Sequence, residues 1–489
     1  MSGYASRLTW SVLGCAVIMG GGARPAWAHG FAARYDLPIP LSLYLLGAAA
    51  AVAASFLVTV LAGRGAPGGG DRGPDLLRLA PFRWLASGVV AFALRLIGVA
   101  ILTLIIVAGF IGDQSPIKNI APVTVWVLWW VGLAYISVLV GNFWAALNPW
   151  HSLYDWARRL CGVRRRPAPY PQSLGVWPAV ALFAAFAWIE LIWSGAERPL
   201  NLAWLILAYS VLTWAGMAWF GARAWRDHGE AFSVAFGLFA RFAPIVAERP
   251  ARGPALFRLR PYAVGLLDKE PPSASMAGFI LLMLATVTFD GILETPAWLA
   301  TKSAILSTER IAPFLFWLRD VTGDVHAAVE SAGLILFPLL FAGIYLLVCR
   351  ATARLGGGHG PGLVARRFAP TLVPIAIAYH LAHYLSFFLI AGQAAIPLIS
   401  DPFGWGWDLF GTAGYRLDVA VIGARGVWFT SVAAIVAGHA IAVYLAHVSA
   451  LRLFADRRQA LRSQYPMLAL MVAYTTISLW ILSQPVVAG

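Results

Sequence analysis

The chain has 489 residues, of which 60% are hydrophobic and only 12% carry a charge, and its formal net charge is +14. Its mean hydropathy of +0.74 is far above that of a soluble protein of this length, so composition excludes a soluble globular fold and favours membrane-spanning helices. The three cysteines, Cys15, Cys161 and Cys349, lie far apart without a CxxC spacing, which supports neither a disulfide framework nor a zinc knuckle.

The N-terminus has the parts of a secretory signal peptide. Residues 1–28 contain Arg7, then an apolar run, then Ala-Trp-Ala, an Ala-x-Ala ending that stops at Ala28. This pattern predicts cleavage after Ala28, with an uncleaved first span as the alternative. His29 would then be the first mature residue, and its amine and imidazole together suggest a copper chelate.

Ten apolar runs follow the signal segment, and each is about as long as one bilayer crossing. They cover residues 41–63, 86–111, 122–147, 174–194, 200–222, 275–299, 330–349, 371–392, 425–448 and 466–487. The sequence therefore predicts an all-α fold, a polytopic transmembrane helical bundle that occupies residues 29–489.

Basic residues indicate how this bundle is oriented. If the mature N-terminus lies outside, the inward loops carry 25 lysine and arginine residues, and the outward segments carry 8 when Arg425 at the outer end of the ninth run is included. The inward loops are residues 64–85, 148–173, 223–274, 350–370 and 449–465. The bias predicts a multi-pass protein of the bacterial inner membrane with both mature termini outside. The basic charge then orients the chain and contacts lipid, so we expect the bilayer and no nucleic acid as its partner.

Two apolar segments are too short to be further spans. Ala231–Val246 is apolar nearly all round, which favours a re-entrant or interfacial helix on the inner side. Ile305–Leu318 is expected to lie flat on the outer membrane surface.

Ionisable residues lie inside three of the predicted spans, where they are costly and therefore suggest a function. His380 and His383 share one helix face, Asp290 and Glu294 are spaced i, i+4, and His439 lies in the ninth run. With a rise of ~1.5 Å per residue, His380 and His439 lie roughly 13 Å from the inner boundary, His383 about 18 Å and Asp290 about 22 Å. These matched depths predict that the side chains converge.

Histidine and carboxylate are the ligands that zinc, iron and manganese prefer. The metal hypothesis assigns His380, His383, His439 and Asp290 as ligands of a divalent transition metal, with Glu294 as a general base. Two alternatives remain open: hydrogen bonds that merely join helices, and a haem held between His380 and His439.

A second candidate cluster lies toward the outside. His326 and Glu330 are spaced i, i+4 just before the seventh run, and His29 is expected on the same side. These residues are weaker metal-ligand candidates because outside water can solvate them.

Other charged residues have simpler interpretations. Arg95 lies in the middle of the second run, where it pairs with Asp290 or Glu190 or extends to the membrane surface. His151 and Asp155, spaced i, i+4 in an inward loop, are expected to form an exposed pair.

Three stretches resemble bacterial multi-pass membrane proteins named fenitrothion hydrolases. They are AHGFAARYDLPIPLSLYLLGAAA at 28–50, VGNFWAALNPWHSLYDW at 140–156 and GEAFSVAFGLFARFAPI at 229–245. The resemblance implies hydrolysis of an organophosphorus triester, an apolar small molecule, with release of a phenol. It brings no catalytic residues with it.

The sequence leaves three functions open. A metal-activated water at the His/Asp/Glu site would suit triester hydrolysis. The same residues suit a proton- or metal-coupled transporter, in which they form the coupling path. A haem-binding electron-transfer subunit is the third interpretation.

Overall fold

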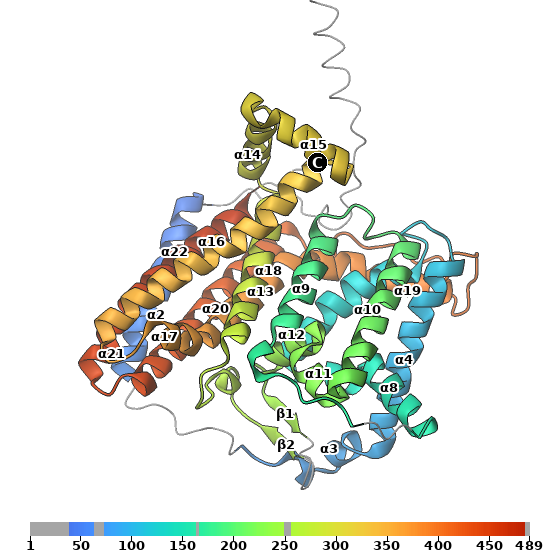
Figure 1. Cartoon of the computed structure of the whole chain (residues 1–489), viewed down its shortest axis with the longest axis horizontal. Coiled ribbons are helices and arrows are strands. Elements are labelled where there is room, and N and C mark those ends of the chain that lie inside the picture. The colour runs from blue at the N-terminus through green and yellow to red at the C-terminus, as the bar shows by residue number, and fades with distance from the viewer. Residues whose placement is uncertain (1–38, 63–72, 163–165, 249–255, 485–489) are drawn as a thin grey trace, which may run out of the picture.

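The structure is a computed structural model that describes residues 39–62, 73–162, 166–248 and 256–484. The predicted signal peptide, its cleavage site and His29 lie outside the described residues. Within these ranges, 10 helices are long and apolar enough to cross a membrane, which confirms the all-α polytopic bundle (Figure 1).

The spans follow the apolar runs closely, although several ends differ. The spanning helices are α2 (Leu41–Ala62), α4 (Gly88–Ile111), α5 (Ile120–Pro122) continued by η2 (Val123–Gly132) and α6 (Leu133–Leu139), α9 (Trp177–Leu191), α10 (Pro199–Phe220), α13 (Ala274–Leu293), α16 (Val325–Gly356), α18 (Val373–Ala391), α20 (Ala424–Leu453) and α22 (Tyr465–Ser483). The shorter helices are α3 (Ala80–Leu85), α7 (Trp144–Leu147), α8 (Pro149–Leu160), α11 (Ala222–His228), α12 (Ala231–Ala240), α14 (Pro296–Leu306), α15 (Ala312–Thr322), α17 (Pro361–Phe368), α19 (Ala395–Ser400) and α21 (Arg457–Ser463).

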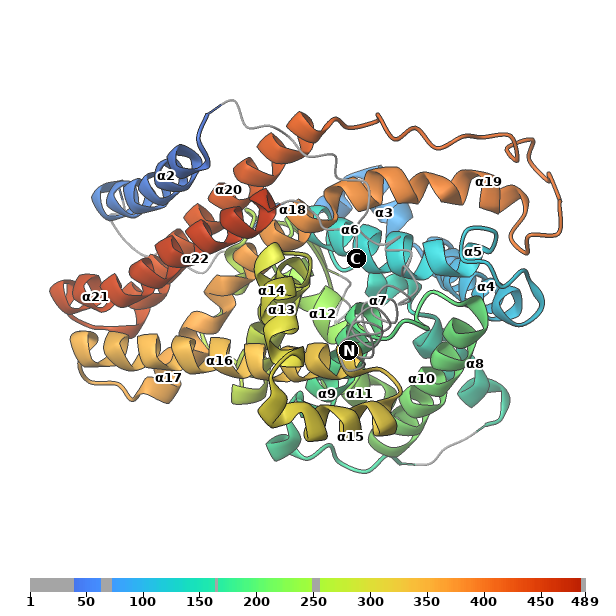
Figure 2. The same cartoon turned by 90° about the horizontal axis from the view of Figure 1, so that it is seen from above.

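Helices α13 and α18 form the centre of the bundle. Helix α13 packs against α9, α16 and α18, and α18 packs against α20. Seen from above, α2, α20 and α22 lie to one side of this centre and α4, α5 and α10 to the other (Figure 2). Polar groups on α13 and α18 are therefore enclosed by protein and kept away from lipid.

Two of the apolar runs are interrupted well before they end. The run 275–299 breaks because the Thr295 hydroxyl accepts from the Trp298 amide at 3.2 Å and so begins α14. The run 122–147 breaks at Gly141, where an added Cβ would lie 2.8 Å from the Ile245 carbonyl oxygen. Because this close approach comes from a distant part of the chain, apolarity alone does not reveal it.

A short β-hairpin, which the sequence analysis did not predict, closes one end of the bundle. Strands β1 (Ile245–Glu248) and β2 (Leu256–Leu259) are antiparallel, with Ile245 opposite Leu259. Helix α12 comes just before β1 and is surrounded by α6, α7, α9 and α18. It is therefore enclosed by other helices and is not the interfacial helix that was one prediction for this segment.

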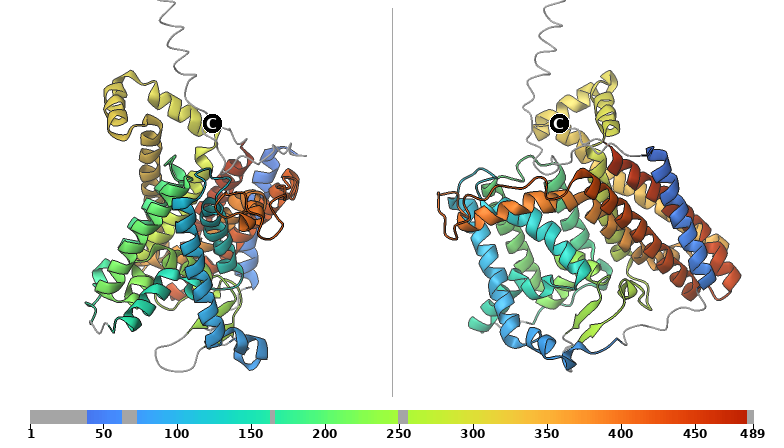
Figure 3. Two further views of the ribbon diagram at one scale, coloured as in Figure 1. Left: turned by 90° about the vertical axis from the view of Figure 1, so that its right-hand side faces the viewer. Right: turned by 180° about the vertical axis from the view of Figure 1, so that it is seen from behind.

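The opposite end carries α14 and α15, which project beyond the spans (Figure 3). The predicted surface helix at Ile305–Leu318 is instead divided, because α14 ends at Leu306 and α15 begins at Ala312. We refer to the two ends of the bundle as the hairpin end and the α14–α15 end.

Candidate functional site

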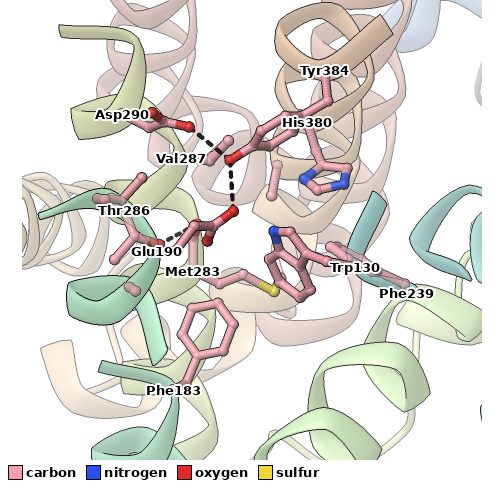
Figure 4. A pocket seen from close by; sticks show the side chains of 13 residues that line it. Trp130, Phe183, Glu190, Phe239, Met283, Thr286, Val287, Asp290, His380 and Tyr384 are labelled. Carbon is pink, nitrogen blue, oxygen red and sulfur yellow. Dashed lines mark hydrogen bonds between the residues drawn. The ribbon is translucent and has the colours of Figure 1, made fainter. Parts of the chain in front are cut away.

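Four largely buried side chains from three helices form a connected network near the middle of the molecule. The Nε2 atom of His383 lies 2.9 Å from Oδ2 of Asp290. The Tyr384 hydroxyl donates to the same Oδ2 atom at 2.6 Å and lies 3.3 Å from Oε1 of Glu190 (Figure 4). We call these four residues the Asp290 network.

Helix geometry explains how the network assembles. His383 and Tyr384 are adjacent on α18, while Asp290 and Glu190 lie in the last turns of α13 and α9. Since α13 packs against both α9 and α18, the two carboxylates approach the same stretch of α18. The side chains of His383 and Asp290 are 7% and 4% exposed, so their ionisable groups interact with one another and not with solvent.

A small cavity adjoins the network. Its volume is about 20 Å³, and its lining includes Glu190, Asp290, Tyr384, His380 and Trp130. A cavity of this size has room for about one water molecule. The Nε2 atom of His380 is buried here and has no hydrogen-bond partner among the described residues. Figure 4 shows the Trp130 indole nitrogen facing the Glu190 carboxylate.

Trp130 belongs to an unusual segment of its span. Residues Val123–Gly132 form a π-helix between two α-helical pieces. π-helical turns are rare and occur frequently at functional sites. This segment lines the small cavity with Trp130 and carries Trp126 one turn nearer the α14–α15 end.

The predicted convergence is only partly observed. The structure brings His383 and Asp290 together and places His380 on the neighbouring cavity wall. His439 lies elsewhere: its Nδ1 atom is 2.8 Å from the Ile435 carbonyl oxygen, and its ring packs against Tyr474 of α22 at 5.8 Å between centroids. The equal depth predicted for His380 and His439 therefore did not bring them together, because His439 packs toward α22.

Glu294, the predicted general base, lies at the edge of the network. It is half-buried at the end of α13 and does not line the cavity, but its charge acts on His383. Among the described residues, no three His, Cys, Asp or Glu side chains lie close enough to hold one metal ion. The donor set of the described residues does not fit the predicted divalent metal, and the metal site stays a prediction from sequence.

The outer cluster has a different partner from the one expected. Glu330 pairs with Lys302 of α14 at 3.0 Å, and both side chains are largely buried. His326 lies one turn earlier on α16, where its backbone amide donates to Asp324. Glu330 thus anchors α14 to α16.

One interpretation of the sequence paired Arg95 with Asp290 or Glu190, but the structure shows neither contact. Instead the Arg95 guanidinium lies 3.6 Å from Asp155 of α8, and His151 Nε2 lies 3.4 Å from the same carboxylate. The pair predicted to be exposed is therefore half-buried. Burial lowers the pKa of His151, and this effect exceeds the opposing influence of Asp155. The imidazole is consequently neutral at pH 7.

A second buried carboxylate, Glu230, has a structural role. It accepts hydrogen bonds from the Phe232 and Ser233 amides, which begin α12, and from the Tyr209 hydroxyl and the Asn148 amide. The two backbone amides fix Glu230 at the start of α12, which gives this carboxylate a structural role. Asn148 and Glu230 belong to two of the stretches that resemble fenitrothion hydrolases, so these stretches pack against each other.

Two members of the network were missed or misread from sequence. Glu190 was considered only as a partner for Arg95, and Tyr384 was not singled out. The available signals were a lone carboxylate in the apolar run 174–194 and a tyrosine four residues after His380. Neither signal shows which helices are neighbours.

Comparison with protein-family models, with curated proteins and with solved structures gives no match for this chain. The resemblance to fenitrothion hydrolases therefore stays a prediction from sequence. Any proposal for function has to rest on the geometry of the Asp290 network and its surroundings.

Proposed function

We propose that this protein is a membrane transporter whose Asp290 network carries the coupling proton. The observation that carries the proposal is the connection of two buried carboxylates through one phenol hydroxyl. Burying an ionisable group between membrane helices costs free energy, so such groups are rare. Where they occur, they commonly form proton pathways.

Proton counting explains why the network suits this task. A tyrosine hydroxyl has one proton, and Tyr384 uses it to donate a hydrogen bond to Asp290 in the shorter contact. The longer contact to Glu190 is a simultaneous hydrogen bond only if Glu190 is protonated and donates to the phenol oxygen. Two ionised carboxylates around one phenol would repel each other in a low-dielectric site. Glu190 is therefore the proton-bearing member, and Tyr384 connects it to Asp290 and His383.

The size of the adjoining cavity favours proton transfer over hydrolysis at this site. About 20 Å³ admits a water molecule but neither an organophosphorus triester nor a haem. A water there would meet Glu190, and the unpartnered Nε2 of His380 lies on the same wall. The proton path then runs from His383 through Asp290 and Tyr384 to Glu190.

Proton flux into proteoliposomes tests the proposal. We expect purified protein to acidify liposomes under an inside-negative potassium diffusion potential, read with an entrapped pH-sensitive dye. Asp290→Asn and Glu190→Gln should reduce the rate to that of protein-free liposomes. Asp155→Asn, which changes a carboxylate outside the network, should keep the wild-type rate. A wild-type rate no faster than protein-free liposomes, or unchanged rates in both network variants, would contradict the proposal.

A further inference from the structure

A much larger cavity lies toward the α14–α15 end and shares no lining residue with the small one. Its volume is about 720 Å³, within the range of roughly 300–1,000 Å³ that small-molecule sites occupy. Its walls come from α5, η2, α18, α19, the loop that follows α19, and the segments between α4 and α5 and between α9 and α10. Among its lining residues are Trp126, Trp407, Phe387, Glu197, Asp401 and Asp408.

The loop wall is firmly attached to the bundle. The Asp113 amide donates to the Phe403 carbonyl at 2.7 Å, and the Ile120 amide donates to the Pro402 carbonyl at 3.1 Å. The rings of Trp405 and Trp407 lie 5.0 Å apart in an edge-to-face arrangement. The cavity is therefore a formed site with aromatic walls.

Charge around the cavity favours a positive ligand. Three carboxylates line it against one lysine, Lys118, which is 64% exposed at its side chain and lies 3.9 Å from Asp113. The Asp401 carboxylate accepts from the Trp405 and Gly406 amides, and Asp408 accepts from the Ala413 amide. These backbone donors satisfy two of the three carboxylates.

Glu197 is the carboxylate left for a ligand. Among the described residues it has no ion pair and no side-chain hydrogen bond. Burial alone raises the pKa of Glu197, which reflects a charge held in an apolar wall without a compensating partner. A bound cation would remove that cost.

We infer that this cavity binds a small apolar organic cation, with Glu197 as the counter-charge and Trp126 and Trp407 as aromatic contacts. Aromatic faces attract cations through the ring quadrupole, and the remaining apolar lining suits hydrocarbon substituents. The role of this cation as the transported substrate rests on the proposed function, whereas its binding does not.

One aromatic layer separates the cavity from the Asp290 network. Phe387 lines the cavity, and its ring centroid lies 6.3 Å from that of Tyr384. Trp126 also lines it and stacks on Phe186 at 5.8 Å, and Phe186 contacts Trp130 at 4.8 Å. The cation site and the Asp290 network are thus separated by a single layer of aromatic side chains. Binding of a cation on one side of this layer can therefore be coupled to release of a proton on the other side.

Equilibrium binding of tetraphenylphosphonium to the detergent-purified full chain tests the inference. We expect saturable binding to the wild type and an affinity about tenfold lower in Glu197→Gln, which removes the charge but keeps the shape. Trp407→Leu should also weaken binding. Glu309→Gln, an exposed position away from the cavity, is the matched control and should bind as the wild type does.

Three outcomes would overturn the inference. They are absence of tetraphenylphosphonium binding to the wild type, unchanged affinity in both Glu197→Gln and Trp407→Leu, and equal competition by neutral triphenylphosphine oxide. Asp290→Asn, which should stop proton flux, should still bind the cation. The binding assay therefore tests the cavity alone, and the flux assay tests the Asp290 network alone, so failure of one proposal can be told from failure of the other.

Discussion

At the scale of single residues, the partners of a buried carboxylate distinguish chemistry from architecture. Glu230 accepts from the two backbone amides that begin α12, from one side-chain amide and from one phenol, whereas Asp290 contacts an imidazole and a phenol that also lies 3.3 Å from a second carboxylate. Imidazole and phenol both accept and release protons, so Asp290 belongs to a chain of exchangeable groups. Glu197 is a third case, a carboxylate beside a ligand-sized cavity.

The raised pKa of Glu197 predicts a pH dependence for cation binding. An ionised Glu197 attracts the cation, so affinity is present above the pKa of Glu197 and is lost as pH falls through it. Because burial raises that pKa, the loss should begin above the usual glutamate value of about 4.3. The other titratable groups on the cavity wall are Lys118, Asp401 and Asp408.

Tetraphenylphosphonium affinity measured over a pH series checks this prediction. Glu197→Gln should bind weakly and with little pH dependence over the same interval. Identical pH profiles for the wild type and Glu197→Gln would show that Glu197 does not titrate in the bound site.

At the scale of helices, the contact between α18 and α20 positions the network. Gly438 of α20 faces Ala378 and Pro374 of α18, and a Cβ added there would lie 2.5 Å from the Ala378 Cβ and 2.7 Å from the Pro374 carbonyl oxygen. Small residues allow such close approach between membrane helices. Since His383 and Tyr384 lie further along α18, displacement of this helix would move them relative to Asp290.

Gly438→Ala should therefore destabilise the protein and impair proton flux together. Overpacking of this kind costs about 1–3 kcal/mol. Thermal unfolding in detergent and the liposome assay measure the two effects. Gly343→Ala on α16 is the control, because a Cβ there meets nothing within 4 Å, and it should leave both unchanged. Wild-type stability and flux in Gly438→Ala would mean that this contact does not set the network geometry.

Helix content could be predicted from sequence, but helix neighbours could not. Long apolar runs indicate spans because the bilayer requires them. Depth along a span also matched His383 to Asp290 correctly. Depth does not specify the facing direction, so His439 was grouped with His380 although it packs on Tyr474. Glu190 belongs to the network because α9 packs against α13, and the sequence does not reveal that contact.

At the scale of the whole molecule, the two ends of the bundle differ in access. At the hairpin end, arginines attach the loop before α13 to its neighbours: Arg241 pairs with Asp268, Arg367 donates to the Asp268 carbonyl at 2.7 Å, and Arg452 donates to the Leu267 carbonyl at 2.7 Å. The large cavity lies at the other end. This arrangement is consistent with the proposed transporter, and the excess of basic residues predicts that the hairpin end is cytoplasmic.

Cysteine labelling tests that orientation. Cys161 is exposed at the end of α8, whereas Cys349 is buried. A membrane-impermeant maleimide should label Cys161 in inside-out vesicles and not in intact cells. In a Cys161→Ser background, Ser307→Cys beyond α14 should show the opposite pattern. Labelling of Cys161 in intact cells would reverse the predicted topology.

The most direct test of the central claim is the protonation state of Glu190. Infrared difference spectra of the detergent-purified protein, recorded between acidic and alkaline pH, detect the carbonyl stretch of a protonated carboxyl group. The account predicts such a band near neutral pH in the wild type, its loss in Glu190→Gln and its retention in Asp155→Asn. A band that persists unchanged in Glu190→Gln, or that is absent from the wild type, would contradict the claim that the Asp290 network holds a proton.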